Sequence, residues 1–416
     1  MWLRPLRLLN TSSGYVLFES IWLKVLIAGG GIGGLAAALA CTLSGHEVQL
    51  FEKAEKFSEV GAGVQLGPNV MRVLHGWGLA EAVQNIAAFP QQLQAREAAK
   101  GQVLGTLKLG DQARRRYGFA YATAHRADLH GVLLAALEQQ PASHLHVSCA
   151  VEGFDQDAGS IHLHLADQSG VQGDLLIGAD GLWSVVRDQM LHDGKPHATG
   201  HLAYRALVQQ SGLPSALRST QITAWLGPRM HVVQYPVRGG DWLNVVAVIA
   251  NGYQGGASGA ASGWDHAANA PALRDATAGV CKPLHELIDA IDDWRTWALF
   301  QRPAMRGPHE HAQNRVALLG DAAHPMLPYL AQGAGMAIED AAELGRSLGT
   351  TADTDAPQAL QRYAQARWQR NARVQSRSIR NGQIFHAVGP VAWTRNLSMR
   401  VLGERVMDLP WLYGHE

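Results

Sequence analysis

The sequence has few cysteines, no excess of either charge and no long apolar run, and each shortage excludes a class of protein. Cys41, Cys149 and Cys281 form no CxxC pair, which excludes a cysteine-rich zinc module and fits a reducing cytoplasm. Lysine plus arginine number 35, and aspartate plus glutamate also number 35, so the basic surface of a nucleic-acid-binding protein is missing. No stretch reaches the roughly 20 apolar residues of a membrane span. We therefore expect a globular cytoplasmic protein without a nucleic-acid or membrane partner.

The first 22 residues are expected to form an extension outside the globular core. Their apolar start is interrupted by the polar residues 10–14, which is too early for a secretory signal peptide. The pattern of a globular domain begins at Leu23.

Glycine, by contrast, is abundant, with 45 residues among 416 and an average usage in proteins of only about 7%. Many of these glycines gather in three clusters, at residues 29–34, 178–181 and 333–335. Glycine is selected where a backbone must turn sharply or approach a ligand. The clusters therefore predict places where the backbone approaches a bound molecule.

The first cluster has the pattern of a dinucleotide-binding unit. Residues 23–28 are typical of a buried parallel strand, and the segment after the glycines has strong helix propensity. Gly29 would permit a tight turn, Gly31 the approach of a pyrophosphate, and Gly34 close packing of the helix on the strand. The N-terminus of the helix would then face the phosphates.

An acidic residue follows at the spacing that this pattern requires. Residues 47–51 are predicted to form a second strand, which leads directly into Glu52 and Lys53. An acid at this position can accept hydrogen bonds from a ribose diol. The pattern predicts dinucleotide binding, and a purely structural glycine-rich turn is the alternative.

Two further clusters lie far downstream, each after a predicted buried strand. Residues 174–187 contain Gly178-Ala179-Asp180-Gly181, and residues 315–340 contain Gly320-Asp321 followed by a helix that opens at Gly333-Ala334-Gly335. Open α/β sheets bind ligands at the C-terminal ends of their strands, which points to both aspartates. A role as a helix cap or turn residue is the alternative for Asp321. A second full GxGxxG is absent, which disfavours the reductases with two Rossmann domains.

With these motifs in this order, residues 24–380 resemble the class A flavoprotein aromatic hydroxylases, which share the p-hydroxybenzoate hydroxylase fold. The resemblance implies that Gly29, Gly31, Gly34 and Glu52 bind the ADP part of FAD. It implies that Asp180 and Gly181 form a motif that serves FAD and NAD(P)H, and that Asp321 holds the ribityl chain of the flavin.

The resemblance also assigns residues around the flavin ring. Arg126 opens a predicted helix that runs to about residue 138, and it matches an arginine that contacts FAD, with a surface arginine as the alternative. Pro325 matches a proline beside the flavin. The helix that opens at Gly333 and Ala334 would stabilise negative charge on the reduced flavin with its N-terminus.

The implied fold class is α/β, with a Rossmann-like FAD-binding domain, an interleaved β-sheet substrate domain and C-terminal helices. The FAD-binding domain is expected over residues 23–95, 112–198 and 304–350, the substrate domain over 96–111 and 199–303, and the C-terminal helical region over 351–416. Within these regions we expect a flexible loop at 251–263, a helix over 271–291 and an amphipathic surface helix over 356–380. The apolar tail beyond it is expected to pack on the body or on a partner, which leaves a homodimer open.

The activity implied by the resemblance is hydroxylation of an aromatic ring. NAD(P)H reduces FAD, O2 gives a C4a-hydroperoxyflavin, and this species hydroxylates an electron-rich ring. A phenol reacts best as phenolate, so a group of the site should hold or relay its proton. His231 and Tyr235, four residues apart on one face of a predicted strand, match a histidine and a tyrosine that face the substrate in such enzymes. We expect them to be catalytic; an ordinary strand histidine and a core tyrosine are the alternative.

Three more residues complete the expected substrate site. Gln65 matches a position near the flavin and the substrate. Pro328 stands where 3-hydroxybenzoate 6-hydroxylases usually have glutamine, while 6-hydroxynicotinate 3-monooxygenases have histidine at the positions of Tyr329 and Gln65. We expect a small hydroxylated aromatic or heteroaromatic acid. Conversion of 3-hydroxybenzoate to gentisate is the first choice, and salicylate and 6-hydroxynicotinate are the alternative substrates.

The sequence leaves the activity and the nicotinamide cofactor open, and the spacing of the histidines bears on whether a metal is bound. A flavin oxidase or reductase that never hydroxylates is the alternative from a different class, and the sequence does not distinguish NADH from NADPH. The chain has 19 histidines, but His162 and His164 are expected on a solvated strand face and His309 and His311 in a polar loop. Neither pair has carboxylates at the spacing of a metal site, so no metal is expected.

Overall fold

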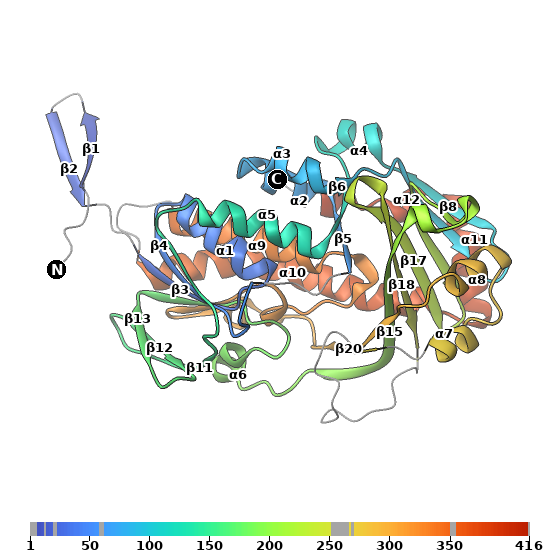
Figure 1. Ribbon diagram of the computed structural model, residues 1–416. Helices are drawn as coiled ribbons and strands as arrows, with labels where there is room; N and C mark the ends of the chain where they lie inside the picture. Colours follow the sequence, from blue (N-terminus) through green and yellow to red (C-terminus); the bar gives the residue numbers. More distant parts are fainter. Residues whose placement is uncertain are drawn as a thin grey trace.

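Two large sheets organise the protein (Figure 1). The computed structural model describes residues 6–11, 14–19, 23–57, 62–250, 266–267, 270–349 and 355–414. The remaining residues, which include ten of residues 1–22 and all of the segment 251–263 discussed above, lie outside the described part of the chain. Residues 6–11 and 14–19 form a hairpin, β1 (Leu6–Thr11) and β2 (Gly14–Glu19), which pair with each other.

The first large sheet has six strands in the order β10-β4-β3-β14-β22-β21. The strands β10, β4, β3, β14 and β22 run parallel, and β21 pairs antiparallel with β22. Their bounds are β3 (Lys24–Ala28), β4 (Glu47–Phe51), β10 (Ser143–His146), β14 (Leu175–Gly178), β21 (Ala312–Gln313) and β22 (Val316–Leu318). Both predicted strands around the first glycine cluster are present in this sheet.

The second large sheet has eight strands in the order β19-β20-β15-β18-β17-β16-β7-β8. Their bounds are β7 (Gln92–Glu97), β8 (Val103–Lys108), β15 (His197–Gln209), β16 (Ile222–Gly227), β17 (Met230–Val237), β18 (Trp242–Ile249), β19 (His266–Ala267) and β20 (Arg295–Gln301). The chain thus enters this sheet twice, at 92–108 and at 197–301, which agrees with the interleaving expected from the sequence. The division into domains itself stays a prediction.

Two small sheets and thirteen α-helices complete the described structure. The small sheets are β11 (Val151–Gln156), β12 (Ile161–Leu165) and β13 (Gly170–Gly173), and β5 (Gly63–Leu66), β9 (Ala122–His125) and β6 (Ala87–Ala88). The helices are α1 (Ile32–Leu43), α2 (Pro68–Gly76), α3 (Ala80–Ile86), α4 (Gly110–Tyr117), α5 (Arg126–Glu138), α6 (Val185–Leu191), α7 (Ala270–Ala276), α8 (Lys282–Asp289), α9 (Gly333–Gly349), α10 (Ala356–Phe385), α11 (Gly389–Leu402), α12 (Glu404–Met407) and α13 (Pro410–Tyr413).

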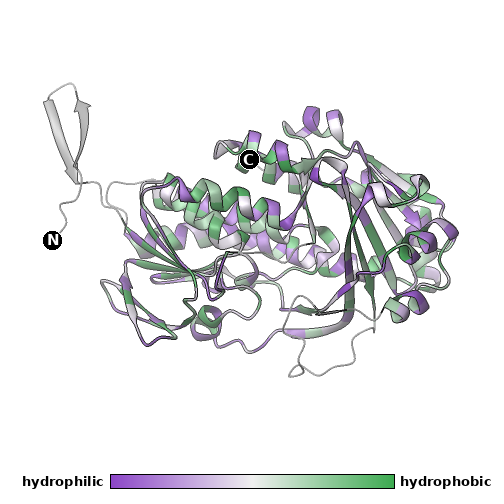
Figure 2. Ribbon diagram, in the orientation of Figure 1, coloured by the Kyte–Doolittle hydropathy of each residue, from purple (hydrophilic) through white to green (hydrophobic). Residues whose placement is uncertain are grey.

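The two faces of the eight-stranded sheet meet different parts of the protein. Side chains alternate between the faces of a strand, and on β17 Val232 belongs to a core cluster with Leu284 and Leu287 of α8. The opposite face packs on Tyr329 and on Phe385 at the end of α10. Figure 2 shows how apolar the strands of this sheet are compared with the helices α7 and α8 outside it. The face turned away from α8 is therefore the one that looks toward the first sheet and its helices.

The single helix expected over 271–291 is wrong, because the structure divides it into α7 and α8. Gly279 lies in the turn between them, and Pro283 stands in the first turn of α8. Proline is tolerated at the start of a helix but disrupts its interior, so it favours a new helix here.

The amphipathic surface helix expected over 356–380 is present and continues to Phe385, with one face exposed and the other buried. α10 has 30 residues, and one side of it buries polar side chains, among them Arg367, Asn371, Gln375 and Ser378. Their spacing of three or four residues puts them on one face, and each finds a hydrogen-bond partner in the interior. Such a row of polar residues is predicted from the sequence to face solvent, because the buried partners that satisfy it are not visible in the local pattern.

The chain after α10 divides into an exposed and a buried part. Trp393 and Leu402 of α11 are exposed, whereas Tyr413 of α13 is buried against Gly67 and the ring of Tyr121. The tail therefore packs on the body at its end. Among the described residues, none of the helices is both long enough and apolar enough to cross a membrane.

Candidate active site

Three glycine turns meet at one edge of the six-stranded sheet. In the register of the sheet Gly178 of β14 lies beside Ala28 of β3 on one side and beside Leu318 of β22 on the other. Each strand ends in a glycine turn: β3 leads into residues 29–34 (the first turn), β14 into residues 178–181 (the second turn) and β22 into Gly320-Asp321 (the third turn). Clusters about 150 residues apart in sequence therefore converge at the C-terminal edge of a parallel sheet, where such sheets bind ligands.

The first turn is built so that only glycine fits. Gly29 has a φ of +103°, and a Cβ on Gly34 would lie 1.8 Å from the carbonyl oxygen of Gly29. The helix α1 can approach the end of β3 only because both side chains are missing. Gly31 is the N-cap of α1, so the first N–H groups of the helix, which have no partner inside it, face the edge of the sheet.

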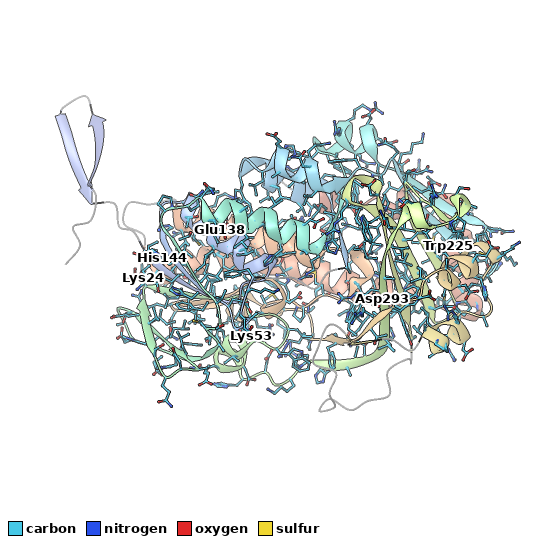
Figure 3. The ribbon with its side chains drawn as sticks, viewed as in Figure 1. Lys24, Lys53, Glu138, His144, Trp225 and Asp293 are labelled. Atoms are coloured by element: carbon cyan, nitrogen blue, oxygen red, sulfur yellow. The ribbon has the colours of Figure 1, made fainter. Side chains whose placement is uncertain are left out.

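Glu52 stands beside this turn, as expected. Its Oε2 accepts a hydrogen bond from the N–H of Gly30 at 2.6 Å, and its Oε1 accepts one from the N–H of Ala54 at 2.8 Å. A carboxylate offers about four lone-pair sites, so these bonds orient Glu52 and leave room for a ribose diol. Lys53 is exposed after the end of β4 (Figure 3).

Asp180 has one oxygen occupied and one without a partner. Its Oδ2 caps α6 by accepting hydrogen bonds from the N–H groups of Val185 and Val186, at 2.8 and 3.2 Å. Its Oδ1 is buried and has no hydrogen-bond partner in the described structure. Burial raises the pKa of this carboxyl. An unsatisfied buried oxygen is unfavourable, which indicates that a ligand group completes this site next to Gly181.

The second and third turns are joined by Arg187. Its Nη1 donates to the carbonyl oxygens of Ala322 and Ala323, and its Nε and Nη2 donate to Asp193. Arg187 was not among the site residues expected from the sequence. Its side chain is buried and holds the backbone that follows Asp321.

Asp321 lies at the start of α9. A Cβ on Gly333 would be 3.9 Å from Oδ1 of Asp321, so the carboxylate and the N-terminus of this helix are neighbours. Gly333 and Ala334 form the first turn of α9. Pro325, which lies between Asp321 and this helix in the sequence, is buried. The helix N-terminus and Asp321 therefore face the same space, as a ribityl chain with its ring would require.

Arg126 begins α5, as predicted. Its backbone N–H donates to the carbonyl oxygen of Ala62, just before β5. Gln65 of β5 is buried, and its Oε1 accepts a hydrogen bond from the hydroxyl of Tyr121 at 2.7 Å. Both expected contacts of the flavin thus come from adjacent segments that pair through β5 and β9.

These residues fit a bound FAD. The glycine turn forms a cradle that any Cβ would fill, Oδ1 of Asp180 lacks a partner, and the first turns of α1 and α9 offer N–H groups. The cradle and the N-terminus of α1 suit a pyrophosphate, and the N-terminus of α9 suits a flavin ring. Asp321 can accept a ribityl hydroxyl between them.

His231 and Tyr235 lie on one face of β17, the face turned away from α8. Both are buried, with exposed fractions of 2% and 5%. A Cβ on Gly63 would lie 2.9 Å from the Tyr235 hydroxyl, so Tyr235 reaches β5 close to Gln65. His231 lies four residues earlier on the same strand, about 13 Å away, and packs against the ring of Tyr329 at 5.4 Å between centroids.

The surroundings of His231 include two histidines that the sequence did not reveal. Nδ1 of His231 is 2.8 Å from Nε2 of His386, which follows α10. The hydroxyl of Tyr329 is hydrogen-bonded to Nδ1 of His201 on β15, and the rings of His201 and His386 are 5.0 Å apart. Burial first, and then the two other imidazoles, hold the pKa of His231 well below its usual range.

Pro328 and Tyr329 occupy the 3₁₀ turn Pro328–Leu330. Tyr329 is buried beside His231, whereas Pro328 is exposed. The structure thus brings Tyr329 together with His231 and does not bring Pro328 to them. The departure from the 3-hydroxybenzoate enzymes at position 328 therefore lies next to the site rather than in its wall.

A buried network of charged side chains packs next to the third turn. Asp340 of α9 accepts hydrogen bonds from Nε of Arg367 at 2.7 Å and Nδ2 of Asn371 at 2.8 Å, and its Oδ2 lies 2.5 Å from Nε2 of His324. Burial alone would raise the pKa of Asp340, but His324 and Arg367 hold that pKa far below its usual value. The preceding residue, Glu339, is paired with Arg367 and Arg370.

His311 was expected in a polar loop and is instead fully buried in this network. With His324 and Asp340 it forms a cluster whose ligand atoms lie within 4.8 Å of one another. However, Nδ1 of His311 is bonded to the carbonyl oxygen of Leu318 and its Nε2 to the side-chain amide of Asn371. Both nitrogens are occupied and an arginine is adjacent, so this cluster is a hydrogen-bonded core rather than a metal centre. His162 and His164 are exposed, as expected.

The comparisons with known proteins agree with this geometry. The FAD binding domain family model matches residues 23–378. A 3-hydroxybenzoate 6-hydroxylase of Polaromonas naphthalenivorans is 37% identical over 94% of this chain and 96% of its own length. A 6-hydroxynicotinate 3-monooxygenase of Bordetella bronchiseptica is 34% identical over 85% of this chain and 89% of its own. A salicylate hydroxylase solved with its substrate is 26% identical, with a TM-score of 0.79, and covers 95% of this chain and 96% of its own.

The resemblance noted in the sequence and the α/β fold expected from it are thereby confirmed, together with FAD as the cofactor. The chain belongs to the FAD binding domain family, among its FAD-dependent monooxygenases.

Proposed function

We propose that this enzyme hydroxylates 3-hydroxybenzoate at C6, which gives gentisate, with NAD(P)H and O2 as co-substrates. The observation that carries the proposal is the pair His231 and Tyr235, buried on the face of β17 that looks toward the FAD-binding elements. The N–H of a neutral imidazole can donate a hydrogen bond to a phenolate oxygen, and a tyrosine hydroxyl can bind a carboxylate. The named activity of the 37% identical Polaromonas relative supports this choice.

Each part of the site has a separate task in this reaction. The ADP part of FAD would be bound by Gly29, Gly31, Gly34 and Glu52. Asp180 and Gly181 would bind the neighbouring phosphate region of the cofactor. Asp321, Pro325, Gly333 and Ala334 would surround the ribityl chain and the ring, with Arg126 beside them. When bound, FAD supplies the acceptance of hydride from NAD(P)H and the activation of O2, while the protein orients the substrate and excludes water.

The substrate would lie between the ring and the eight-stranded sheet. His231 would hold the phenolic oxygen, Tyr235 would bind the carboxylate or the ring, and Tyr329 would pack against the substrate from the turn after Asp321. Gln65 would border both flavin and substrate. The buried position of these side chains favours a small, planar acid, because apolar neighbours keep water from the reacting carbon.

Two other substrates remain as alternatives within the same chemistry. A 6-hydroxynicotinate enzyme is 34% identical, but this chain has Gln65 and Tyr329 where those enzymes have histidines. Salicylate is supported by the solved hydroxylase at 26% identity. An NAD(P)H-consuming oxidase that makes no hydroxylated product is the alternative from a different class.

One experiment separates these functions. NADH and NADPH oxidation is measured with 3-hydroxybenzoate, salicylate, 6-hydroxynicotinate and benzoate, and products are identified by chromatography against standards. Gentisate in a yield close to the NAD(P)H consumed is the expected result. Catechol or 2,5-dihydroxypyridine would favour the alternatives, and hydrogen peroxide without any hydroxylated product would favour the oxidase.

Two further expectations belong to this proposal. Cys41, Cys149 and Cys281 are free, which supports a reducing, cytoplasmic environment. A homodimer is supported by the exposed apolar side chains of α11, such as Trp393 and Val401, and sedimentation of the purified holoenzyme tests it.

A further inference from the structure

His231 is hydrogen-bonded to a second imidazole, and this contact determines which of its nitrogens carries a proton. Nδ1 of His231 and Nε2 of His386 are 2.8 Å apart, although the two residues are separated by 155 positions in sequence. Both rings are buried. With Nδ1 occupied in this way, Nε2 is the nitrogen of His231 that remains for a substrate.

The backbone around His386 is fixed from three sides. Its N–H donates to the carbonyl oxygen of Gly382, and its own carbonyl oxygen accepts a hydrogen bond from the N–H of Arg229 at 3.1 Å. Nη1 of Arg395 donates to the carbonyl oxygens of Ile384 and Phe385, at 3.1 and 2.8 Å. The imidazole of His386 is therefore held against His231 by the end of α10, by α11 and by the turn before β17.

Burial is the main cause that lowers the pKa of both rings and keeps them neutral near pH 7. Three titratable groups face the pair. They are His201 from β15, Tyr329 from the turn Pro328–Leu330 and Arg395 from α11. Burial lowers the pKa of His386 to about 4, with His201 and Arg395 acting in the same direction. Two neutral imidazoles in contact share one hydrogen, so one ring donates and the other accepts.

The free nitrogen of His386 decides which ring donates. Nδ1 of His386 is buried and has no hydrogen-bond partner among the described residues. A hydrogen on this atom would be an orphaned buried N–H group, which is rarer in proteins than an under-satisfied acceptor. The hydrogen of His386 therefore sits on Nε2 and is donated to Nδ1 of His231, and His231 carries its own hydrogen on Nε2.

We propose that His386 is a positioning residue for hydroxylation, because it fixes His231 as the tautomer whose Nε2–H donates to a phenolate oxygen of the substrate. This inference rests on the proposed function. The site then selects the ionised form of the substrate: the O–H bond of the phenol breaks in solution, water takes the proton, and the phenolate binds to the donor. His231 acts as a hydrogen-bond donor throughout, and His386 acts only through it.

The test measures the ionisation of the bound phenol in the FAD-loaded enzyme. The phenolate of 3-hydroxybenzoate is followed by ultraviolet difference spectroscopy as a function of pH in wild type, His386→Leu and His386→Gln. Leucine removes the donor, whereas the amide of glutamine can still donate to Nδ1 of His231. We expect His386→Leu to raise the pKa of the bound phenol by about one unit, since a lost hydrogen bond to a charged group amounts to about tenfold in an equilibrium, and His386→Gln to restore most of it.

Controls separate this effect from a general disturbance of the protein. His144 is exposed on β10, at the opposite end of the molecule (Figure 3), and His144→Leu should leave the titration unchanged. FAD content is measured for every variant. If His386→Leu does not fold, the tautomer is read in the wild type by ¹⁵N shifts of labelled histidine, where His231 should show a protonated Nε2 and a bare Nδ1.

The outcomes are distinguishable from those of the proposed function. Equal pKa values of the bound phenol in wild type and in folded His386→Leu, or a bare Nε2 on His231, would overturn the role of His386. An enzyme that binds 3-hydroxybenzoate without hydroxylating it would contradict the proposed function, while the titration would still test His386. Absence of any binding would contradict both.

Discussion

Arg187 donates a hydrogen bond from its Nη1 to the carbonyl oxygen of Ala322 at 3.0 Å, and this bond ties the second glycine turn to the third. The residue after Ala322 accepts a second bond from the same nitrogen. The guanidinium thus fixes the backbone around Asp321 from the side of Asp180. Two motifs that are far apart in sequence are held in one geometry by a side chain that need not touch the cofactor.

Replacing Arg187 by lysine should loosen FAD. An ammonium group keeps the charge but cannot reproduce the fork that reaches Ala322, Ala323 and Asp193 together. We expect the dissociation constant for FAD, measured by flavin fluorescence, to rise about tenfold, which corresponds to the loss of one or two hydrogen bonds. Arg306→Lys, at an exposed position, is the matched control and should bind FAD as the wild type does.

Gly34→Ala should abolish FAD binding. The added methyl group would lie 1.8 Å from the carbonyl oxygen of Gly29, so α1 or the turn must move and the phosphate cradle is lost. The apoprotein should be isolated without flavin absorbance. Gly131→Ala in α5 has open space around the new methyl group and should stabilise the protein by up to about 1 kcal/mol. A yellow, fully loaded Gly34→Ala protein would contradict the proposed cradle.

Glu339→Gln should destabilise the protein in a pH-dependent way. Burial would raise the pKa of Glu339, but Arg367 and Arg370 hold it at about 2, below its ordinary value of 4.5. Stability from a carboxyl with a lowered pKa is complete above its ordinary pKa and is lost as pH falls toward the folded value. We expect a loss of about 3 kcal/mol in urea unfolding at pH 7.

The pH dependence gives this prediction its control. Because the wild type alone has the ionised Glu339 to lose, the difference in unfolding free energy between the two proteins should shrink as pH falls from about 5 toward 3. A difference that stays constant over this range would mean that the charge of Glu339 contributes nothing.

His231→Asn should keep FAD and lose hydroxylation. Asparagine is close in size and leaves the glycine turns untouched, but its amide differs from imidazole in reach and direction. The rate of product formation with 3-hydroxybenzoate should fall at least about 100-fold, in the range of a lost hydrogen-bond donor to an oxyanion. His285→Asn on α8, whose side chain is half exposed on the outer face of the sheet, should have the wild-type rate; unchanged coupling in His231→Asn would refute the assignment.

The sequence predicted the parts of this site that depend on local patterns. The strand Glu47–Phe51 and the helix Arg126–Glu138 appear with the predicted bounds, because apolar periodicity and turn residues specify them locally. The spacing of His231 and Tyr235 placed both on one strand face for the same reason.

What the sequence could not reveal depends on contacts between distant segments. His386 and His201 join His231 only because the end of α10 and β15 approach the same strand face, and no local spacing encodes that approach. His311 and Arg367 looked solvated, since a polar residue is recognised as buried only when its partner, here Asn371 or Asp340, is known. A histidine shortly after a long C-terminal helix was the one available signal, and by itself it is weak.

The order of strands in the six-stranded sheet has a consequence for how the protein is made. β14 pairs with β3 and with β22, so the sheet joins residues near 25, 176 and 316. Pairing over such separations is slow and needs all partners to be present. A growing chain on the ribosome that has not yet released β22 lacks the third turn and exposes one edge of β14. Because β22 ends at Leu318 of 416 residues, the complete site for the flavin can form only after about three quarters of the chain have been synthesised.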